Sequence, residues 1–381
     1  MGIRAMTRVV VAGVGIHPFG RFDGLTNTDM GVHAVRAALS EAGEPRIDAA
    51  FCGTAYGGVA SGHKVLGALA RTGIPIVDIE AGCASGGAAL QLAAGAIRAG
   101  QYECALVFGV EKMPKGIIRS SFFEPWREEA GLAATPAYFA LRAQRLLRES
   151  GLTKEHLAQV VVKNRRHGVH NPNAMFRKEV DAEGVLASRL VCEPLHLWML
   201  CSPNEGAAAI VLRRATDADR DAITLASARL RSHLPGSVLG EATPLSGVDD
   251  TDITPPSTLA ARDAYEEAGI GPDDVDVVEC QDTDAARELL AYQELDLCAP
   301  GGQAELLASG ATALGGGRPV NPSGGLLSKG EPLGASALGQ VVELVHQLRG
   351  EAGPRQVEGA RVGLAHTVGR GANACCVIVA R

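Results

Sequence analysis

The sequence predicts an α/β protein made of two related halves, and three observations support this fold class. Strand-like and helix-like segments alternate along most of the 381 residues, which favours sheets covered by helices. The decapeptide AVRAALSEAG at 34–43 recurs as AARDAYEEAG at 260–269, an internal repeat of a helix that ends in glycine. Glycine is abundant, with 47 residues, and aromatic residues make up only 4%, so neighbouring elements can pack closely.

The first half is expected over residues 1–220. It begins with the strand-like run VVVAG at 9–13, which is followed by the first copy of the repeated helix. Turn-forming residues then separate short apolar segments from one another. In this half we expect strands at 47–52, 74–80 and 104–110 and a helix at 86–99.

The second half is expected over residues 221–381 and repeats this order. After its copy of the helix, Ser323-Gly324-Gly325 precedes a further helix, as Ser85-Gly86-Gly87 does in the first half. Because strands alternate with helices in both halves, we predict a mainly parallel sheet in each. The remaining expected elements are strands at 275–280 and 361–366 and a helix at 284–292 with Asp282 as its N-cap.

A long insertion interrupts the first half at about 112–200. It contains several prolines, a predicted helix near 137–149 and the basic run KNRRHGVHNP at 163–172. A long insertion at a sheet end is often a lid or a substrate-binding loop. The basic run is either a solvated turn or part of a surface that holds a phosphate-bearing ligand. The candidates for such a surface are Arg165, Arg166, His167, Arg177 and Lys178.

Composition excludes several classes of protein. The formal net charge of −7 argues against nucleic acid as the main partner. We expect no membrane span, because no apolar run reaches ~20 residues, and no signal peptide. Nine scattered cysteines without a Cys-x-x-Cys pair indicate reduced thiols and a cytoplasmic protein. No cluster has metal-ligand spacing, and no complete dinucleotide-binding glycine motif is present, so we expect neither a metal nor a nucleotide cofactor.

The segment EAGCASGG places Cys83 between a predicted strand and a predicted helix. Small neighbours would let a substrate carbonyl approach the thiol, and a helix N-terminus lowers the pKa of a thiol. A thiolate is a good acyl acceptor. The alternative is that Cys83 is simply a small buried residue, as many free cysteines are. We therefore treat Cys83 as a candidate nucleophile.

Several long segments resemble the thiolase family. EAGCASGGAALQLAAGAIRAGQ resembles the nucleophile segment of thiolases, and VNPSGGLLSKGEPLGASALGQ resembles their second signature. KNRRHGVHNPNAMFR and CSPNEGAAAIVL are similar to segments of the sterol-carrier-protein, or lipid-transfer-protein-like, type of thiolase. The resemblance extends over about 8–380.

This resemblance implies a five-layer αβαβα sandwich with an inserted loop domain, a homodimer and an acyl-CoA substrate. It assigns the nucleophile to Cys83, and coenzyme A enters as part of the substrate rather than as a separate cofactor. We expect the dimer contact along 105–109, the apolar strand that follows the nucleophile helix. In the second signature, Asn321 would hold a catalytic water, and Ser323 and Gly324 would contact coenzyme A.

The sequence also departs from the family pattern. Thiolases usually have Gly-His-Pro where this chain has Gly330-Glu331-Pro332, and 281–284 reads QDTD where the lipid-transfer type has His-Asp-Cys-Phe. The glycine loop at 365–371 contains no cysteine either. The usual proton-transfer groups are therefore missing. The candidates to replace them are Glu331, Asp284 and His366, with backbone N–H groups of Cys83, Gly369 and Gly371 as an oxyanion hole.

Three functions follow from these patterns. The first is acyl transfer through Cys83, making or breaking a C–C bond in an acyl-CoA. The second is retro-aldol cleavage of a β-hydroxyacyl-CoA with a lipid or steroid side chain, which some lipid-transfer-like relatives perform beside a small OB-fold, zinc-ribbon partner. The third is a non-catalytic subunit that binds lipid or coenzyme A.

Overall fold

The computed structural model describes residues 7–381 except 117, 119–124, 132–133, 235–252 and 370–372. Nine strands form one sheet in the order β3-β2-β4-β7-β1-β8-β11-β10-β9. The first five belong to the N-terminal half and the last four to the C-terminal half. In chain order they are β1 (Val9–Gly20), β2 (Ala49–Gly53), β3 (Ile76–Ile79), β4 (Cys104–Lys112), β7 (Glu205–Arg214), β8 (Thr224–Ser232), β9 (Val277–Cys280), β10 (Val362–Gly369) and β11 (Asn373–Ala380).

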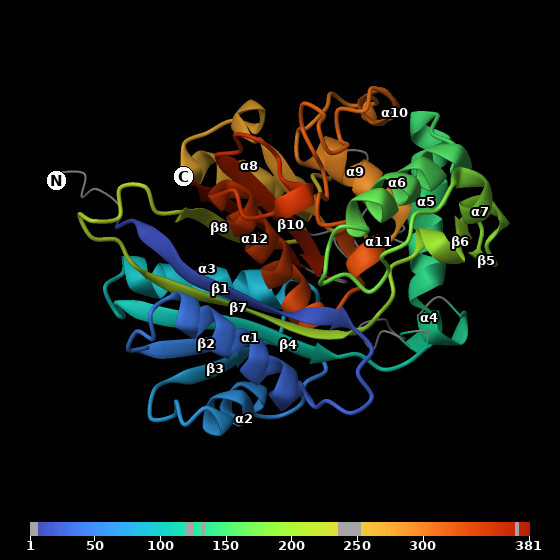
Figure 1. The fold of residues 1–381 in the computed structure, drawn as a ribbon. Coiled ribbons are helices and arrows are strands. Elements are labelled where there is room, and N and C mark those ends of the chain that lie inside the picture. Colours follow the sequence, from blue (N-terminus) through green and yellow to red (C-terminus); the bar gives the residue numbers. More distant parts are fainter. Residues whose placement is uncertain (1–6, 117, 119–124, 132–133, 235–252, 370–372) are drawn as a thin grey trace.

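The sheet divides into two parts between β1 and β8. These strands pair only at Val10 and Thr224, with one further backbone hydrogen bond from Val11 N to Ile223 O. Helices α3 (Ser85–Arg98) and α12 (Leu333–Arg349) lie between the two parts and contact strands of both (Figure 1). The joined sheet is therefore folded around a shared layer of two helices.

Two further helix layers cover the outer faces. Helices α1 (Asn27–Glu41) and α2 (Ser61–Ala68) cover the N-terminal part, and α8 (Pro256–Ala268) and α9 (Ala285–Glu294) cover the C-terminal part. Side chains alternate along β4 accordingly: Phe108 joins the core under α1, whereas Val107 joins the core around α3 and α12. The five-layer αβαβα fold expected from the sequence is confirmed.

The expectation of mainly parallel sheets was wrong. Strand β2 is parallel to β3 and β4, and β9 is parallel to β10, but β7 pairs antiparallel with both β1 and β4. Strand β11 is antiparallel to β10 and β8. For β10 and β11 the reason is the connection: β11 follows β10 directly, and so short a link can only reverse the chain, whereas a parallel pair needs a crossover of a dozen or more residues.

The insertion is mostly helical and gathers at one end of the molecule, on the right in Figure 1. Residues 163–168 of the basic run belong to helix α6. The solvated turn that was one of the two expectations for this run is therefore wrong for these residues. Most side chains of this stretch are buried against the C-terminal half. The elements of the insertion are α4 (Pro125–Glu129), α5 (Thr135–Ser150), α6 (Lys154–Gly168), α7 (Ala182–Ala187), β5 (Leu190–Cys192), β6 (Leu195–His196) and η1 (Leu197–Met199).

Short elements complete the C-terminal half. Ser323-Gly324-Gly325 leads into the five-residue helix α11 (Gly325–Lys329), and the long middle helix α12 begins only after it. The others are η2 (Pro272–Asp274), α10 (Gln303–Ala308) and η3 (Gly353–Arg355). Among the described residues, no helix is both long and apolar enough to cross a membrane.

The starts of the two middle helices meet at one end of the fold. A Cβ atom on Gly109 would lie only 2.0 Å from the carbonyl oxygen of Gly334, so this close approach of β4 and α12 requires glycine. Cys83 lies two residues before α3, and Glu331 lies two residues before α12. Equivalent ends of the duplicated layer therefore bring these two side chains together.

The dimer contact expected along 105–109 is wrong. Strand β4 is paired with β2 on one side and β7 on the other, and its residues in this range are buried. A strand with both edges paired has no backbone groups left to offer a second copy. The unpaired edge of the N-terminal part belongs to β3.

Candidate active site

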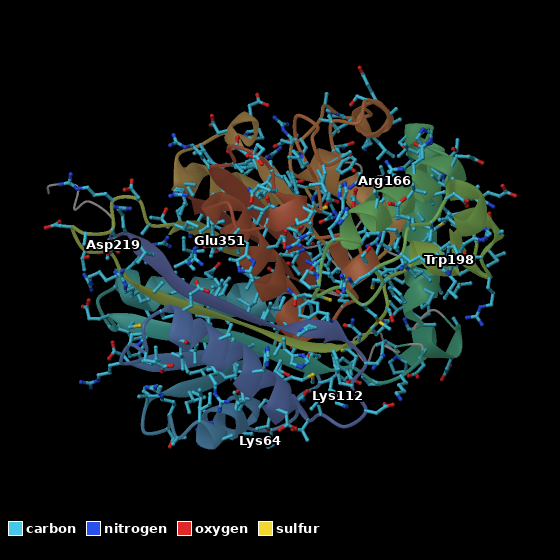
Figure 2. All side chains as sticks on the ribbon, viewed as in Figure 1. Lys64, Lys112, Arg166, Trp198, Asp219 and Glu351 are labelled. Atoms are coloured by element: carbon cyan, nitrogen blue, oxygen red, sulfur yellow. The ribbon has the colours of Figure 1, made fainter. Side chains whose placement is uncertain are left out.

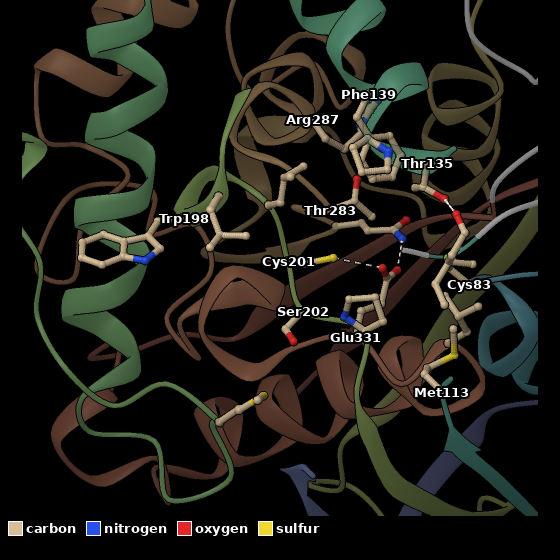
Figure 3. Close-up of a pocket in the computed structure, with 18 of the residues that line it drawn as sticks. Cys83, Met113, Thr135, Phe139, Trp198, Cys201, Ser202, Thr283, Arg287 and Glu331 are labelled. Carbon is tan, nitrogen blue, oxygen red and sulfur yellow. Dashed lines mark hydrogen bonds between the residues drawn. The ribbon is translucent and has the colours of Figure 1, made fainter. Parts of the chain in front are cut away.

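A cavity of about 1570 Å³ lies between the starts of the middle helices and the insertion. Its wall includes the predicted nucleophile Cys83 and the predicted acid/base Glu331, together with Cys201, Gln281 and Thr283. Figure 3 shows Trp198 across the cavity from Glu331, whereas Thr283 and Phe139 lie on the same side as Glu331. The cavity therefore extends from the core of the fold out along the insertion.

Cys83 occupies a tight turn between β3 and α3. Gly82 has a left-handed φ of +59°, and the Ser85 hydroxyl closes the turn by donating to Gly82 O at 2.6 Å and accepting from Ala81 N at 2.9 Å. The cysteine is 5% exposed. The strand–turn–helix arrangement predicted from the sequence is present, with the thiol at a helix N-terminus and on the cavity wall.

Glu331 is the centre of a group of hydrogen-bond donors. Gln281 Nε2 donates to Glu331 Oε1 at 2.7 Å, and the Cys201 thiol donates to Oε2 at 3.3 Å (Figure 3). The Cys83 thiol is also close enough to this carboxylate to affect its ionisation. Burial raises the pKa of Glu331, the interactions with Cys83, Cys201 and Gln281 lower it, and the charge of Asp284 raises it further; the net shift is upward.

The surrounding backbone fixes these side chains. Glu331 N donates to Ser202 O at 2.9 Å, and Cys201 N donates to Thr283 O at 2.9 Å. Gln281 Oε1 accepts from the backbone N–H of Val368, so its amide group is oriented with the NH₂ toward Glu331. Segments from both halves and from the end of the insertion therefore converge on one carboxylate.

Cys201 and Gln281 were not identified as site residues from the sequence. Burial and the nearby Glu331 raise the pKa of the Cys201 thiol well above its usual value, so it stays protonated at neutral pH. The sequence signals were that Cys201 stands at the end of the insertion, just before β7, and opens the segment CSPNEGAAAIVL, which resembles lipid-transfer-type thiolases. Gln281 stands where the lipid-transfer type has the histidine of its His-Asp-Cys-Phe motif, but it was not proposed as a site residue because an amide does not titrate.

Asp284 lies beside the site but does not line the cavity. Its carboxylate caps α9 by accepting from Ala286 N at 3.0 Å and Arg287 N at 3.1 Å, and it forms a buried ion pair with Arg142. The predicted N-cap Asp282 was wrong, because its carboxylate instead accepts from Leu326 N at 2.6 Å at the start of α11. Both aspartates are held by structural contacts.

His366 and Asn321 also lie outside the cavity wall. His366 Nε2 is 2.9 Å from the Ser257 hydroxyl of α8, so the ring faces the outer helix layer. Burial and the nearby charge of Arg287 lower the pKa of His366 well below its usual value, which keeps it neutral. Asn321 is buried in another network, accepting from Cys280 N at 3.0 Å and donating to Glu288 at 2.7 Å.

The end of β10 touches the nucleophile turn. A Cβ atom on Gly369 would lie 2.3 Å from the carbonyl oxygen of Ala81, so only glycine fits there. This contact brings one proposed oxyanion residue next to Cys83. Gly371, the other, lies outside the described residues.

The structure separates the predicted coenzyme A residues. Arg165, Arg177 and Lys178 line the cavity, and the last two are exposed at its rim. Arg166 of α6 is exposed on the outer surface and does not line the cavity (Figure 2). His167 is buried, with Nδ1 2.9 Å from Asn321 O and Nε2 accepting from Leu314 N at 3.1 Å. Burial lowers the pKa of His167 to about 3, so it carries no charge for a phosphate.

Ser323 and Gly324 support the fold beneath the cavity. The Ser323 hydroxyl donates to Glu279 at 2.6 Å, and a Cβ atom on Gly324 would lie 2.6 Å from Cα of Gly168. Neither residue lines the cavity. No group of three or more potential metal ligands occurs in the part of the chain that the structure describes.

Arg165 is the most unusual of the basic side chains. It is only 8% exposed, and its guanidinium lies over the Phe176 ring at 4.2 Å. Its Nε atom has no hydrogen-bond partner among the described residues, and no described carboxylate forms an ion pair with it. Burial alone lowers the pKa of Arg165 to about 10. A buried cation without a counter-charge on a cavity wall is a suitable anion site.

Comparisons with known proteins agree with this architecture. Among solved structures, the chain is similar to one described as "Ltp2-ChsH2(DUF35) aldolase", with a TM-score of 0.85 and 23% identity over 98% of this chain and 97% of that one. It is also similar to human mitochondrial 3-ketoacyl-CoA thiolase, with a TM-score of 0.72 and 18% identity over 98% of both chains. At these identities the likeness concerns the fold.

Relatives of higher identity identify the family. The chain is 35% identical to sterol carrier protein 2 of Homo sapiens over 96% of this chain and 70% of that protein. It is also 35% identical to benzoylsuccinyl-CoA thiolase subunit BbsB of Thauera aromatica over 96% of both. The family description "Thiolase, N-terminal domain" matches residues 9–215, and "Thiolase C-terminal domain-like" matches 242–381. With both halves matched and Cys83 at the predicted turn, the chain belongs to the thiolase family.

Proposed function

We propose that the protein makes or breaks a carbon–carbon bond in a 3-oxoacyl-CoA, with Cys83 as the nucleophile and Glu331 as its base. The observation that carries this proposal is that Cys83 and Glu331 line the same cavity wall, with the Cys83 thiol close enough to Glu331 to lower the pKa of its carboxyl group. A nucleophile bonded to a base that a third group orients is the arrangement that activates thiols and hydroxyls in acyl transfer. Here Gln281 is the orienting group.

The environment of Glu331 suits it to this role. A carboxylate of ordinary pKa is too weak a base for a thiol, but burial raises the pKa of Glu331 and so strengthens it. In the cleavage direction Glu331 takes the Cys83 proton, and the thiolate adds to the β-carbonyl carbon. The Cα–Cβ bond then breaks, which leaves an acyl group on Cys83 and an acyl-CoA enolate. A second coenzyme A thiol finally removes the acyl group.

The cavity suits an acyl-CoA. Coenzyme A is a long, polyanionic ligand, and Arg165, Arg177 and Lys178 line the cavity along the insertion. Tyr138 and Phe139 of α5 line another part of the wall, where an acyl chain would find apolar surface. The backbone N–H groups of Cys83 and Gly369 are the proposed donors to the oxyanion.

Mass spectrometry after brief incubation with acetoacetyl-CoA and longer 3-oxoacyl-CoA esters tests the proposal. We expect an acyl adduct on Cys83, and none on a Cys83→Ala variant that remains folded. Cys298→Ala is the matched control, since Cys298 lies outside the cavity wall and its replacement should leave the adduct unchanged. Turnover without an adduct on Cys83 would contradict the acyl-enzyme.

A retro-aldol reaction of a β-hydroxyacyl-CoA is the second candidate. It is favoured by the carboxylate of Glu331, which lines the cavity and could take the hydroxyl proton directly. The name of the aldolase of similar fold includes ChsH2(DUF35), which suggests a small partner protein for this activity. Under this alternative Cys83→Ala keeps its turnover of β-hydroxyacyl-CoA, and an aldehyde or ketone is released without any Cys83 adduct. The third possibility, a non-catalytic subunit that binds lipid or coenzyme A, gives no reason for two thiols to lie beside one buried carboxylate.

A further inference from the structure

Two thiols share the Glu331 carboxylate, and the proposed function uses only one of them. Cys201 Sγ lies 3.3 Å from Glu331 Oε2, and both residues line the cavity. Figure 3 shows the Cys201 thiol directed at the carboxylate, with Thr283 close by. Cys201 therefore combines an exchangeable proton, a neighbouring base and access to substrate.

The position of Cys201 is fixed by the C-terminal half. Besides the bond from its own backbone N–H to Thr283 O, isolated bridges pair Leu200 with Asp284 and Pro203 with Glu331. The segment from 200 to 203 is thus attached on both sides of the cysteine. Such anchoring holds a side chain within the narrow limits that proton transfer needs.

The cleavage reaction needs a proton at the α-carbon. The Cys83–Glu331 pair holds one at that point, the proton that Glu331 has taken from Cys83, and Cys201 is hydrogen-bonded to Glu331 and can pass it on. When the Cα–Cβ bond breaks, the shortened acyl-CoA leaves as an enolate whose α-carbon must be protonated. Thr283 and Gln281, which also line this part of the cavity, are poor acids. Arg142 is held in its ion pair with Asp284. The Cys201 thiol is protonated at rest and has Glu331 beside it to replace the proton it gives away.

We propose that the Cys201 thiol protonates the α-carbon of the departing acyl-CoA enolate, and that its thiolate removes the same proton in the condensing direction. This inference rests on the proposed function. The protons balance: Glu331 accepts one from Cys83, Cys201 gives one to carbon, and Glu331 returns one to the Cys201 thiolate. In the second half-reaction Glu331 takes the proton of the incoming coenzyme A thiol and later restores it to Cys83.

Two readouts separate this role from that of Cys83. The first is the acyl adduct on Cys83, measured by mass spectrometry with 3-oxoacyl-CoA esters. The second is exchange of the methyl hydrogens of added acetyl-CoA for deuterium in D₂O, which reports removal and return of the α-proton without net cleavage. Acetyl-CoA is the product that every straight-chain 3-oxoacyl-CoA releases. Cys201→Ala and Cys201→Ser are compared with wild type and with the control Cys298→Ala. The serine variant keeps a hydrogen-bond donor to Glu331 but offers a much weaker acid.

We expect both Cys201 variants to acylate Cys83 in a single turnover but to lose deuterium exchange by about 10²–10⁴-fold, the usual effect of one acid/base group. Exchange within threefold of wild type in either folded variant would overturn the inference. So would the loss of both acylation and exchange, because Cys201 would then serve the nucleophile rather than the α-carbon. If the wild type itself forms no adduct on Cys83, the proposed function fails, and the inference fails with it.

Discussion

At the scale of single residues, we expect one difference from the usual thiolase sequence, Glu331, to change how protons are transferred in the site. Glu331 stands where thiolases usually have a histidine, and a buried carboxylate needs donors around it. Gln281 and the two thiols Cys83 and Cys201 provide them. A neutral histidine has one donor and one acceptor nitrogen, whereas a carboxylate only accepts, so the donor amide of Gln281 fits the carboxylate.

Replacement of Glu331 by glutamine should abolish most of the activity. The variant keeps the size and polarity of the side chain but cannot accept the Cys83 proton, so we expect kcat/KM to fall by about 10²–10⁴-fold. In the wild type, kcat/KM should rise with pH through a pKa higher than that of an ordinary glutamate, because burial raises the pKa of Glu331. Steady-state rates over a range of pH check both points. If the residual kcat/KM of Glu331→Gln still rises with pH through the same pKa, that pKa belongs to another group.

The same pKa shift has a consequence for stability. The folded-state pKa of Glu331 is raised, so between the unfolded and folded pKa values the folded protein binds more protons, and the free energy of unfolding decreases as pH rises through this window. Glu331→Gln removes this effect. We expect its Tm to exceed that of the wild type above the window and the difference to shrink below it, as measured by calorimetry at several pH values. A Tm deficit that grows with pH would contradict the raised pKa.

At the scale of elements, strand β3 is the exposed edge of the N-terminal part. It pairs only with β2, and Val77 at its centre is 44% exposed. An apolar edge strand is a ready site for pairing with a second chain. The predicted homodimer, which the buried β4 cannot form, is therefore expected through β3.

Val77→Lys should weaken this dimer by roughly tenfold or more, because a lysine on an edge strand opposes edge-to-edge pairing. Sedimentation at several protein concentrations measures the dissociation constant. Val59→Lys is the matched control, since Val59 is 89% exposed but lies outside any strand. An unchanged dimer in the Val77 variant would place the interface elsewhere.

At the scale of the whole molecule, the insertion and the core together form the cavity. Arg165 comes from helix α6 of the insertion and is buried without a described counter-charge. An unpaired buried charge lowers the free energy of unfolding of the empty protein, and we expect a bound anion to offset this loss. The proposed coenzyme A site therefore depends on how the insertion packs on the C-terminal half.

Arg165→Gln should weaken coenzyme A binding by roughly 10–100-fold, which corresponds to the ~1.5–3 kcal/mol of a hydrogen bond to a charged group. At the same time, the variant should be at least as stable as wild type, because a buried charge has been removed. Isothermal titration with coenzyme A and thermal unfolding give the two values. The adjacent Arg166→Gln is the control and should change neither, since Arg166 is exposed outside the cavity. Equal losses in both variants would indicate a general charge effect.

The sequence by itself determined the two-half α/β fold and the turn that carries Cys83. These depend on local patterns: strand and helix alternation, a repeated helix and small residues around one cysteine. Long motifs also indicated the family and singled out Glu331 as the departure from it. Only the tertiary structure decided which groups surround that carboxylate. Cys201 and Gln281 are separated from Glu331 by 130 and 50 residues, and no local pattern encodes a hydrogen bond over such distances. The sequence also could not show the positions of Asp284 and His366. In the fold, Asp284 caps α9 and His366 contacts Ser257 of α8, so both titratable side chains make structural contacts.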